Sequence, residues 1–285
     1  LYDAKPHVGT DILLTVVQNL RHRIEELGGE VRFHTLVEDV NLKNGRVISV
    51  TANGEELPCD CLLMAPGNAA RGLFSRCLEH GIPIEAKPFS VGARIEHLQA
   101  DIDTALYGDY AGHPRLGHGE YQLSQRDAET GRAVYTFCMC PGGVVVPAAS
   151  ERETVVTNGM SFHSRAGRNA NSALVVSVDP RDFGHNPLDG VLFQQQIEQR
   201  AYAAVHGYFA PAQTVGRFLE GRRGAEWGRV EPTYSGGVQQ SDFTEFLPAF
   251  VTEQMKIGLA AFDRKINGFA APDAVLTAPE TRTSS

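Results

Sequence analysis

"PFSVGARIEH", residues 88–97, is the first of a series of short strand-like runs that turn residues separate from one another. The other runs are EYQLSQRD (120–127), RAVYTFCMC (132–140), GGVVVPAA (142–149), TVVTNGM (154–160) and ALVVSV (173–178). Such runs are typical of antiparallel pairing, because antiparallel strands need only a tight turn between them. The region from Lys87 to Val178 is therefore predicted to form a mainly antiparallel sheet.

Regular structure is also predicted on both sides of this region. Apolar residues recur at helical spacing from Thr10 to Leu27, and Gly28 and Gly29 follow as a stop signal. The remaining patterns are strand-like at 30–40, 44–54 and 57–67 and helical at 68–80, 191–204 and 242–266. The predicted fold class is mixed α/β (α+β), with an α/β start, a β-rich middle and an α-helical end.

Composition and charge exclude some classes of function. The chain has 285 residues and a formal net charge of -8, and it contains no block of Lys or Arg. A nucleic-acid partner or an anionic membrane surface is therefore not expected. No apolar run reaches the length of a membrane span, and the first residues lack the layout of a secretory signal. We expect a cytoplasmic protein that acts on a small-molecule substrate.

Four of the five cysteines form two C-x-C pairs, Cys59 with Cys61 and Cys138 with Cys140. Four thiols could hold a tetrahedral zinc ion, but structural zinc sites usually use tight turns with C-x-x-C spacing. Both pairs lie in strand-like runs, and free cysteine is among the most buried residue types. Three interpretations remain: buried apolar side chains, a zinc site, and, for the second pair, thiols beside a reaction centre.

Polar side chains in the sheet region are candidates for binding or proton transfer. In a strand, Arg94 and Glu96 share one face and His97 lies on the other. Arg94 suits bidentate binding of a substrate carboxylate, although an Arg–Glu pair on one face also suits a structural ion pair. His163 lies in a polar loop, for which solvent exposure is the alternative. No Ser-His-Asp order, carboxylate pair or H-E-x-x-H motif supports a hydrolase.

Seven strings of the sequence carry a family resemblance. They are KPHVGTD (5–11), LGGEVRFHTLVEDV (27–40), KPFSVGARIEH (87–97), YTFCMCPGG (135–143), VVTNGMS (155–161), NANSALVV (169–176) and APDAVLTAPETRTSS (271–285). In these strings the sequence resembles the bacterial FAD-dependent dehydrogenases that are often labelled simply FAD-dependent protein. The strings are long and co-linear from Lys5 to Ser285, which makes the resemblance specific.

The resemblance implies a glutathione-reductase-type FAD-binding fold with an inserted substrate domain. Residues 1–86 would be a partial FAD-binding domain, 87–273 the inserted domain, and 274–285 the return to the FAD-binding domain. The sequence departs from the family in lacking the G-x-G-x-x-G phosphate loop and the final glycine-rich turn. Because it opens on Leu1 and stops at ETRTSS, we expect a fragment that is inactive by itself.

Carried over residue by residue, the resemblance also implies contacts with FAD. A corner of small residues after a strand lets the backbone approach the cofactor, although such a corner also serves simply to turn the chain. For Thr10, capping of the first helix is the alternative role. The implied cofactor contacts are His7, Gly9, Thr10, Val37, Ala65, Pro66, Gly67, Arg282, Thr283 and Ser284.

The glycines after Cys140 would let the backbone approach a planar ring, so Cys138 and Cys140 are interpreted as a pocket wall. A dithiol coupled to the flavin is the less favoured alternative, because C-x-C is a tight spacing for a disulfide. The function implied is an FAD-dependent oxidoreductase of dehydrogenase type, with NADH or NADPH as candidate electron donor. Arg94, His97, Cys138 and His163 are the catalytic candidates. A non-catalytic ligand-binding protein on a flavoprotein scaffold is the alternative.

Overall fold

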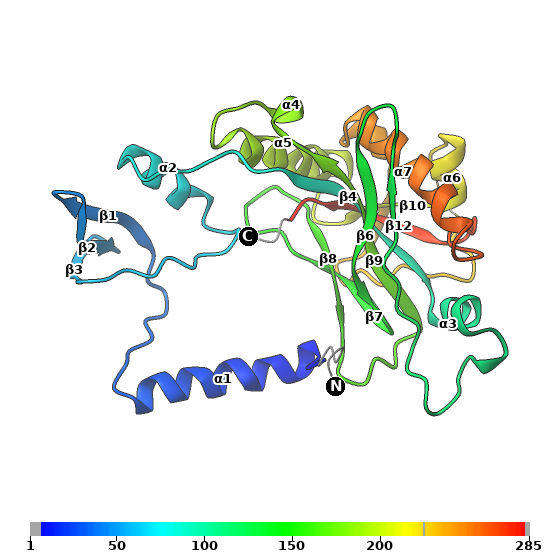
Figure 1. Cartoon of the computed structure of the whole chain (residues 1–285), viewed down its shortest axis with the longest axis horizontal. Helices are drawn as coiled ribbons and strands as arrows, with labels where there is room; N and C mark the ends of the chain where they lie inside the picture. The colour runs from blue at the N-terminus through cyan, green and yellow to red at the C-terminus, as the bar shows by residue number, and fades with distance from the viewer. Residues whose placement is uncertain (1–6, 225, 283–285) are drawn as a thin grey trace. The chain divides into compact units, whose positions relative to one another are not determined.

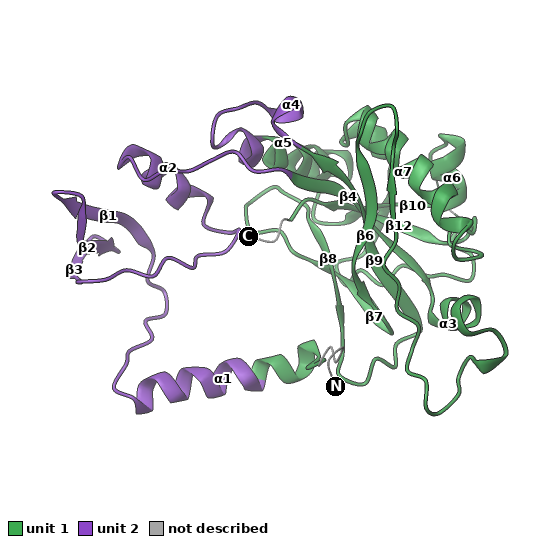
Figure 2. Ribbon diagram, viewed as in Figure 1, with its two compact units in different colours: residues 1–14, 89–178, 193–282 green, residues 15–88, 179–192, 283–285 purple. Residues whose placement is uncertain are grey.

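The structure is a computed structural model that describes residues 7–224 and 226–282 (Figure 1). The chain divides into two compact units, which Figure 2 colours separately. Of the described residues, unit 1 holds 7–14, 89–178, 193–224 and 226–282, and unit 2 holds 15–88 and 179–192.

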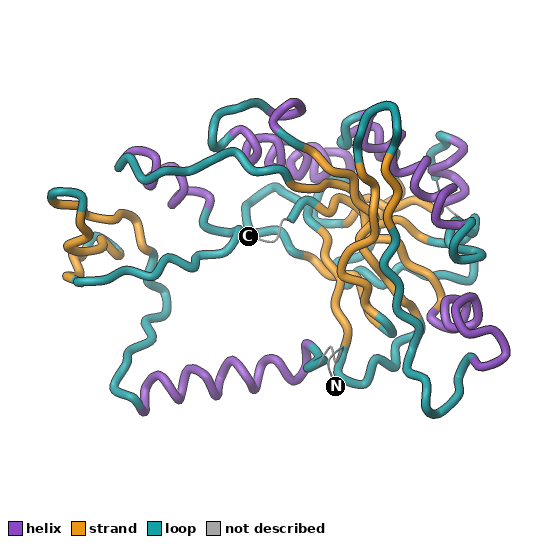
Figure 3. Tube along the Cα trace, viewed as in Figure 1, coloured by secondary structure: helices purple, strands orange, loops and turns teal. Residues whose placement is uncertain are grey.

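Unit 1 is built on a seven-stranded sheet with the order β11-β10-β12-β4-β9-β6-β5, in which all pairs except β10–β11 are antiparallel (Figures 1 and 3). The strands of this sheet are β4 (Phe89–Leu98), β5 (Ser124–Arg126), β6 (Ala133–Cys140), β9 (Asn169–Val178), β10 (Ala210–Thr214), β11 (Val238–Gln240) and β12 (Val275–Glu280). A separate hairpin pairs β7 (Gly143–Pro147) with β8 (Thr157–Ser161). The prediction of a mainly antiparallel sheet is confirmed.

The two central strands, β4 and β9, pair along their whole length, from Phe89 opposite Val178 to Leu98 opposite Asn169. Both are almost completely buried, because the sheet is covered on each face. Helix α7 (Ala249–Asp263) covers the face that carries Val134, and Gly258 permits this close approach, since a Cβ there would lie 2.6 Å from a Val134 methyl. The β7–β8 hairpin contacts β4, β9 and β12 through the other face, where Arg94 lies.

The remaining helices of unit 1 connect the strands at the edges of the sheet. They are α3 (Gln99–Tyr107), α5 (Asp189–Ala204, which begins in unit 2), α6 (Val215–Glu220) and the short η1 (Gly108–Tyr110) and η2 (Phe243–Glu245). Thr214 caps α6 by accepting a hydrogen bond from the Arg217 N–H, and Gly221 ends the helix in the left-handed conformation.

Unit 2 contains an antiparallel meander, β1 (Val37–Lys43), β2 (Arg46–Ala52) and β3 (Glu55–Pro58). Its helices are α2 (Arg71–Glu79), α4 (Pro180–Phe183) and most of α1 (Thr10–Glu26), which has no buried residue. Within residues 7–224 and 226–282, no helix combines the length and the apolar composition that crossing a bilayer requires.

Most predicted elements are confirmed, and the exceptions have local causes. The predicted strand at 57–67 is wrong beyond Pro58, since residues 61–67 form no regular structure and Leu63 is 90% exposed. The predicted strand at 30–40 begins only at Val37, because His34 adopts a positive φ of 53° that breaks the extended run. Strands β10 and β12 and helix α3 were not predicted, because their runs are short or follow a strand without a turn signal.

Replacing Leu174, which is fully buried in the central strand β9, tests this account of the core. Leu174→Ala should lower the free energy of unfolding by about 2–5 kcal/mol, because it leaves a cavity between sheet and helix. Urea unfolding of the chain measures the loss. The control is Ile257→Ala on α7, where the side chain is 45% exposed and the change should stay within about 0.5 kcal/mol. Equal losses in both variants would contradict the assigned core.

Candidate functional site

The best-connected polar group of unit 1 is the guanidinium of Arg94, whose side chain has no exposure to solvent. It pairs with Glu280 on the neighbouring strand β12 through two bonds, from Nε to Oε2 at 2.9 Å and from Nη2 to Oε1 at 3.2 Å. Burial raises the pKa of Glu280, while the charge of Arg94 acts in the opposite direction. The pair therefore removes two charges from water together, in a bidentate geometry that keeps both satisfied.

The remaining donors of Arg94 reach three further elements. Nη2 donates to Asn158 Oδ1 on β8 at 2.7 Å, and Nη1 donates to Asn171 Oδ1 on β9 at 3.3 Å. Nη1 also donates to the main-chain oxygen of Cys138 on β6 at 2.9 Å. One buried side chain thus links both layers of unit 1, the sheet and the hairpin that covers it.

Glu96 shares this face with Arg94 but does not pair with it, so the sequence-based alternative of an Arg94–Glu96 ion pair is wrong. Its carboxylate accepts the Thr233 N–H at 3.1 Å and the Thr233 hydroxyl. Glu280 takes its place because it lies on β12, next to β4. The Glu96 carboxyl is fully buried, and this burial raises its pKa to about 7 although the bonds from Thr233 lower it.

A β-bulge in β6 exposes Cys138. The pairing of β6 with β9 shifts between Phe137 and Cys140, so that one extra residue is inserted on β6. Cys138 adopts a positive φ of 47°, which turns its carbonyl oxygen inward to Arg94 while its side chain is exposed. Cys140 is buried, and its thiol lies 3.3 Å from the same carbonyl oxygen.

The two thiols have opposite acid–base character. The hydrogen bond from the Cys140 thiol is the largest influence on Cys138 and, together with the charge of Arg94, lowers the pKa of Cys138 to about 5. The same bond and burial raise the pKa of Cys140. The single S–H of Cys140 can point to the Cys138 carbonyl or to its sulfur, and a thiolate at Cys138 is the stronger acceptor. These influences favour the thiolate form of Cys138 and the protonated form of Cys140.

Cys138 opens onto a cavity of about 320 Å³ that we call the thiol cleft. Its walls are residues 7–10, 138–141 and 159–161, with Leu13 and Arg165. Arg165 forms an ion pair with Glu120 at 2.6 Å, and its Nε is buried without a hydrogen-bond partner among the described residues. The cleft thus combines a thiol of lowered pKa, a cationic side chain whose Nε donor is free, and apolar wall residues.

The head of α1 is fixed against the loop after β8. Thr10 donates from its hydroxyl to Ser161 O at 3.3 Å, and Asp11 accepts the His163 N–H at 2.8 Å. His163 Nδ1 lies 2.8 Å from Val8 O, and His7 Nε2 lies 3.0 Å from Phe162 O. These bonds place His7, Thr10 and His163 at one end of the thiol cleft. The side chains of Thr10 and Asp11 bind the end of β8 and the loop that follows it.

Two glycines of the cleft region are required by packing of the backbone. A Cβ at Gly9, where φ is +86°, would lie 2.2 Å from His163 N. A Cβ at Gly142, where φ is +52°, would lie 1.7 Å from Arg165 O. The interpretation of the Gly142 step as an approach for a planar ring is wrong, because the Arg165 backbone occupies that position.

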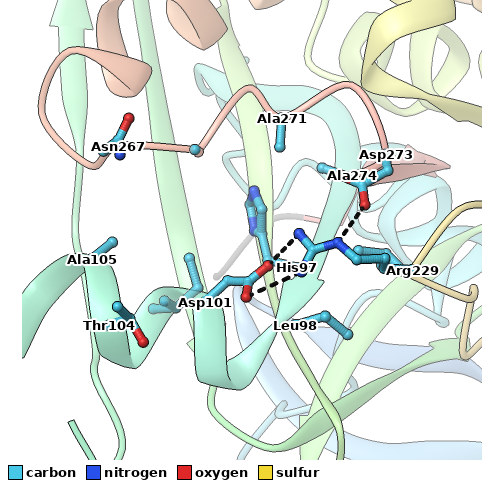
Figure 4. Close-up of a pocket in the computed structure, with 13 residues that line it drawn as sticks. His97, Leu98, Asp101, Thr104, Ala105, Arg229, Asn267, Ala271, Asp273 and Ala274 are labelled. Carbon is cyan, nitrogen blue, oxygen red and sulfur yellow. Dashed lines mark hydrogen bonds and ion pairs between the residues drawn. The ribbon is translucent and has the colours of Figure 1, made fainter.

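His97 lies on the opposite face of the sheet from Arg94, at a second cavity of about 450 Å³ (Figure 4). Its Nε2 lies 2.7 Å from Phe269 O, and Nδ1 has no partner among the described residues. Burial lowers the pKa of His97, which favours the neutral form of its ring. Arg229 joins Asp101 and Asp273 beside the ring, at 2.8 Å and 3.2 Å (Figure 4). A role of His97 in proton transfer stays a prediction.

The other predicted contacts with FAD lie apart from this group in the sequence. Val37 and the corner of Ala65, Pro66 and Gly67 belong to unit 2, and their contact with a cofactor stays a prediction. Arg282 is partly buried in unit 1 and donates to Ala148 O. Thr283 and Ser284 lie outside the described residues.

Sequence reasoning missed Glu280 and Asn158 as partners of Arg94, and it considered Asn171 for a flavin edge, a polar substrate or a tight turn rather than for Arg94. A buried arginine usually pairs with a carboxylate, so the sequence could have indicated that Arg94 has an acidic partner. Identifying Glu280 as that partner requires knowledge of the strand order in the sheet. In the part of the chain that the structure describes, no group of three or more His, Cys, Asp or Glu side chains is placed to hold a metal ion.

Comparison with known proteins assigns the family. The family model described as FAD-dependent protein, C-terminal domain-like, matches residues 88–283, and the chain belongs to this family. It is also 44% identical over 286 aligned positions to an uncharacterized protein of Clostridium beijerinckii (strain ATCC 51743 / NCIMB 8052). That alignment covers 100% of this chain and 54% of the relative, so the chain spans about half the length of the curated relative it matches.

The family description names FAD, and the thiol cleft can be compared with what a flavin needs. A flavin ring presents oxygen and nitrogen acceptors along one edge, and Arg165 Nε is a buried donor without an acceptor among the described residues. The apolar wall residues suit the rest of a planar ring. These two features are compatible with a flavin ring, and its binding in this cleft stays a prediction. The sequence contains no G-x-G-x-x-G loop for the pyrophosphate.

The raised pKa of Glu96 gives a test of the buried polar face. The Glu96 carboxyl keeps its proton up to about pH 7 in the folded chain and up to about pH 4.5 in the unfolded chain. The stabilising contribution of the neutral form is thus complete below pH 4.5 and is lost as the pH rises through 7. The difference between the two pKa values, 7 minus 4.5, corresponds to about 3 kcal/mol in the free energy of unfolding.

Glu96→Gln removes this titration and keeps an acceptor for Thr233. The free energy of unfolding of the variant, relative to the natural chain, should therefore rise by about 3 kcal/mol between pH 4.5 and pH 8. Urea unfolding across this pH range measures the change. The control Glu253→Gln, at an exposed position of α7, should show no such trend. A parallel pH dependence of the natural chain and Glu96→Gln would contradict the assignment.

Proposed function

We propose that this chain is the substrate-side part of an FAD-dependent oxidoreductase of dehydrogenase type. The observation that carries the proposal is the thiol cleft, whose walls at residues 138–141, 159–161 and 165 lie within the match to the FAD-dependent family. The cleft combines a thiol of lowered pKa with Arg165, whose Nε has no hydrogen-bond partner among the described residues. FAD, when bound, supplies a reversible acceptor of a hydride or of two electrons. The residues of the chain supply orientation, charge and exclusion of water.

Distinct roles follow for the residues around the cleft. Arg165 would donate from Nε to the acceptor edge of the flavin ring, and its charge would favour a reduced, anionic ring. Thr10 and His163 would be positioning residues, because their bonds fix the head of α1 at the end of the cleft. Arg94 acts through Cys138, since it holds the carbonyl oxygen of that residue and not the substrate.

The small-molecule substrate would bind against Cys138 at the open side of the cleft. Cys138 borders a second hollow of about 300 Å³, which residues 120–122 and 136–139 line. A substrate in this position would contact both the thiolate and the exposed Phe137 ring. NADH or NADPH is the proposed source of electrons, as in other dehydrogenases that use FAD.

The full-length protein expressed from its gene should be yellow. Its visible flavin absorbance should persist through gel filtration and bleach under anaerobic conditions when NADH or NADPH is added. Absorbance spectra before and after addition of the nucleotide measure both properties. Retention of flavin without reduction would favour the alternative, a non-catalytic ligand-binding protein on a flavoprotein scaffold. A colourless, well-folded full-length protein that takes up no added FAD would contradict the proposal.

Replacing Arg165 tests its proposed contact with the flavin. Arg165→Met in the full-length protein should weaken FAD binding by about tenfold or more, because a charge-assisted hydrogen bond is lost. Fluorescence titration of the apoprotein with FAD measures the change. Arg168→Met is the matched control, since the Arg168 side chain is 61% exposed and lies outside the cleft walls. Equal affinity of the two variants for FAD would remove Arg165 from the site.

A further inference from the structure

The β6 bulge gives two neighbouring thiols different environments, and each thiol has the position that its role would require. Cys138 is exposed at the thiol cleft, whereas Cys140 is buried one residue beyond. The Cys140 thiol donates a hydrogen bond to the Cys138 carbonyl oxygen at 3.3 Å. In a regular strand, two cysteines with C-x-C spacing would project on the same face of the sheet. Both thiols would then have similar exposure to solvent. The bulge removes this restriction.

We propose that Cys138 and Cys140 form a redox-active dithiol that reduces a small organic disulfide, with Cys138 as the nucleophile and Cys140 as the resolving thiol. Low pKa, accessibility and an adjacent second thiol together are the features of redox-active cysteines. The less favoured dithiol alternative of the sequence thus gains support from the bulge. This inference concerns residues of unit 1 and does not depend on bound FAD.

The chemistry balances with the groups present. The Cys138 thiolate attacks one sulfur of the disulfide R–S–S–R, a bond forms between Cys138 and that sulfur, and one thiolate RS⁻ departs. Cys140 then loses its proton to solvent and attacks Cys138 Sγ, which breaks the mixed disulfide and releases the second RS⁻. The disulfide has gained two electrons, and the protein holds a Cys138–Cys140 disulfide. If the proposed function also holds, reduced flavin is the class of reductant that restores the dithiol.

Arg94 is the positioning residue for this chemistry. Its Nη1 holds the Cys138 carbonyl oxygen at 2.9 Å, which maintains the bulge, and its charge favours the thiolate. Glu280 neutralises Arg94 from the side away from β6, through the adjacent strand β12. A lysine at position 94 would keep the charge but could not maintain the fork of bonds to Glu280 and Cys138.

The shape of the cleft favours an organic disulfide over a peroxide. A volume of about 320 Å³ exceeds what a peroxide needs, and the side chains of Leu13, Met139 and Met160 offer apolar contact to carbon groups. Arg165 adds a positive charge that suits a carboxylate on the disulfide. The probe for the test is therefore 5,5′-dithiobis(2-nitrobenzoate), a disulfide with carboxylates that releases a coloured thiolate.

The test compares cysteine variants of the full chain in a background where Cys59, Cys61 and Cys77 are replaced by Ser. With Cys138 and Cys140 present, the protein should release both thiolates of the probe, and mass spectrometry should find a chain lighter by two hydrogens and free of adduct. In the same background Cys140→Ser should stop at the mixed disulfide. Cys138→Ser should react at least about tenfold more slowly. Release of both thiolates by Cys140→Ser, or an unchanged rate in Cys138→Ser, would overturn the proposal.

The pH dependence provides a readout that a structural role would not change. The rate of the first thiolate release should level off above about pH 5, which reflects the pKa of Cys138. In Arg94→Lys the midpoint should move upward toward the value of an ordinary thiol, about 8.5. A midpoint near 8.5 in the unmodified chain would contradict the proposal.

A second measurement avoids dependence on variant folding. The unmodified chain is treated with one equivalent of the probe, digested and mapped, and the peptide that contains residues 138–140 should carry the new disulfide. A disulfide that joins other cysteines, or hydrogen peroxide that forms the bridge faster than the probe does, would overturn the choice of substrate. These results do not bear on flavin binding, which the colour of the full-length protein tests separately.

Discussion

The guanidinium of Arg94 depends on the single carboxylate of Glu280, and the polar face of unit 1 depends on this pair. A charged guanidinium without solvent exposure is stable only if its donors are satisfied. Its hydrogen bonds go to Glu280, Asn158, Asn171 and the Cys138 carbonyl oxygen. Because these donors must be satisfied, Arg94 helps to determine both the position of the β7–β8 hairpin and the bulge in β6.

The bulge connects packing to chemistry. An isolated thiol on a strand would be either buried and unreactive or exposed with an ordinary pKa. Here the inward carbonyl of Cys138 is held by Arg94, and the outward side chain faces the cleft. The structural pair Arg94–Glu280 is therefore joined to the reactive pair Cys138–Cys140 by one hydrogen bond, from Arg94 to the Cys138 carbonyl oxygen. Changes to Arg94 should affect stability and thiol reactivity together.

The sequence predicted the antiparallel sheet, because alternation and turn residues along 88–97 and its neighbours are local properties. It also singled out Arg94 and Cys138 as catalytic candidates, and these roles stay predictions; the Arg94 side chain is buried against Glu280 rather than open to a substrate carboxylate. It could not identify Glu280 or the bulge. Glu280 lies 186 positions from Arg94 in the sequence, and the bulge follows from the pairing of β6 with β9, which local pattern does not determine. Gly142 was predicted to let a planar ligand approach the backbone. In the structure the Arg165 backbone lies there instead, a contact between residues 23 positions apart that local pattern does not reveal.

The coupling between Arg94 and Glu280 tests the central claim most directly. A double-mutant cycle would compare Arg94→Met, Glu280→Met and the double variant by urea unfolding of the chain. Each single change should lower the free energy of unfolding by about 3–5 kcal/mol, because it leaves one buried charge without its partner. The double variant should lose less than the sum, with a coupling energy of about 1–3 kcal/mol. Additive losses would contradict the claim that this pair organises the site.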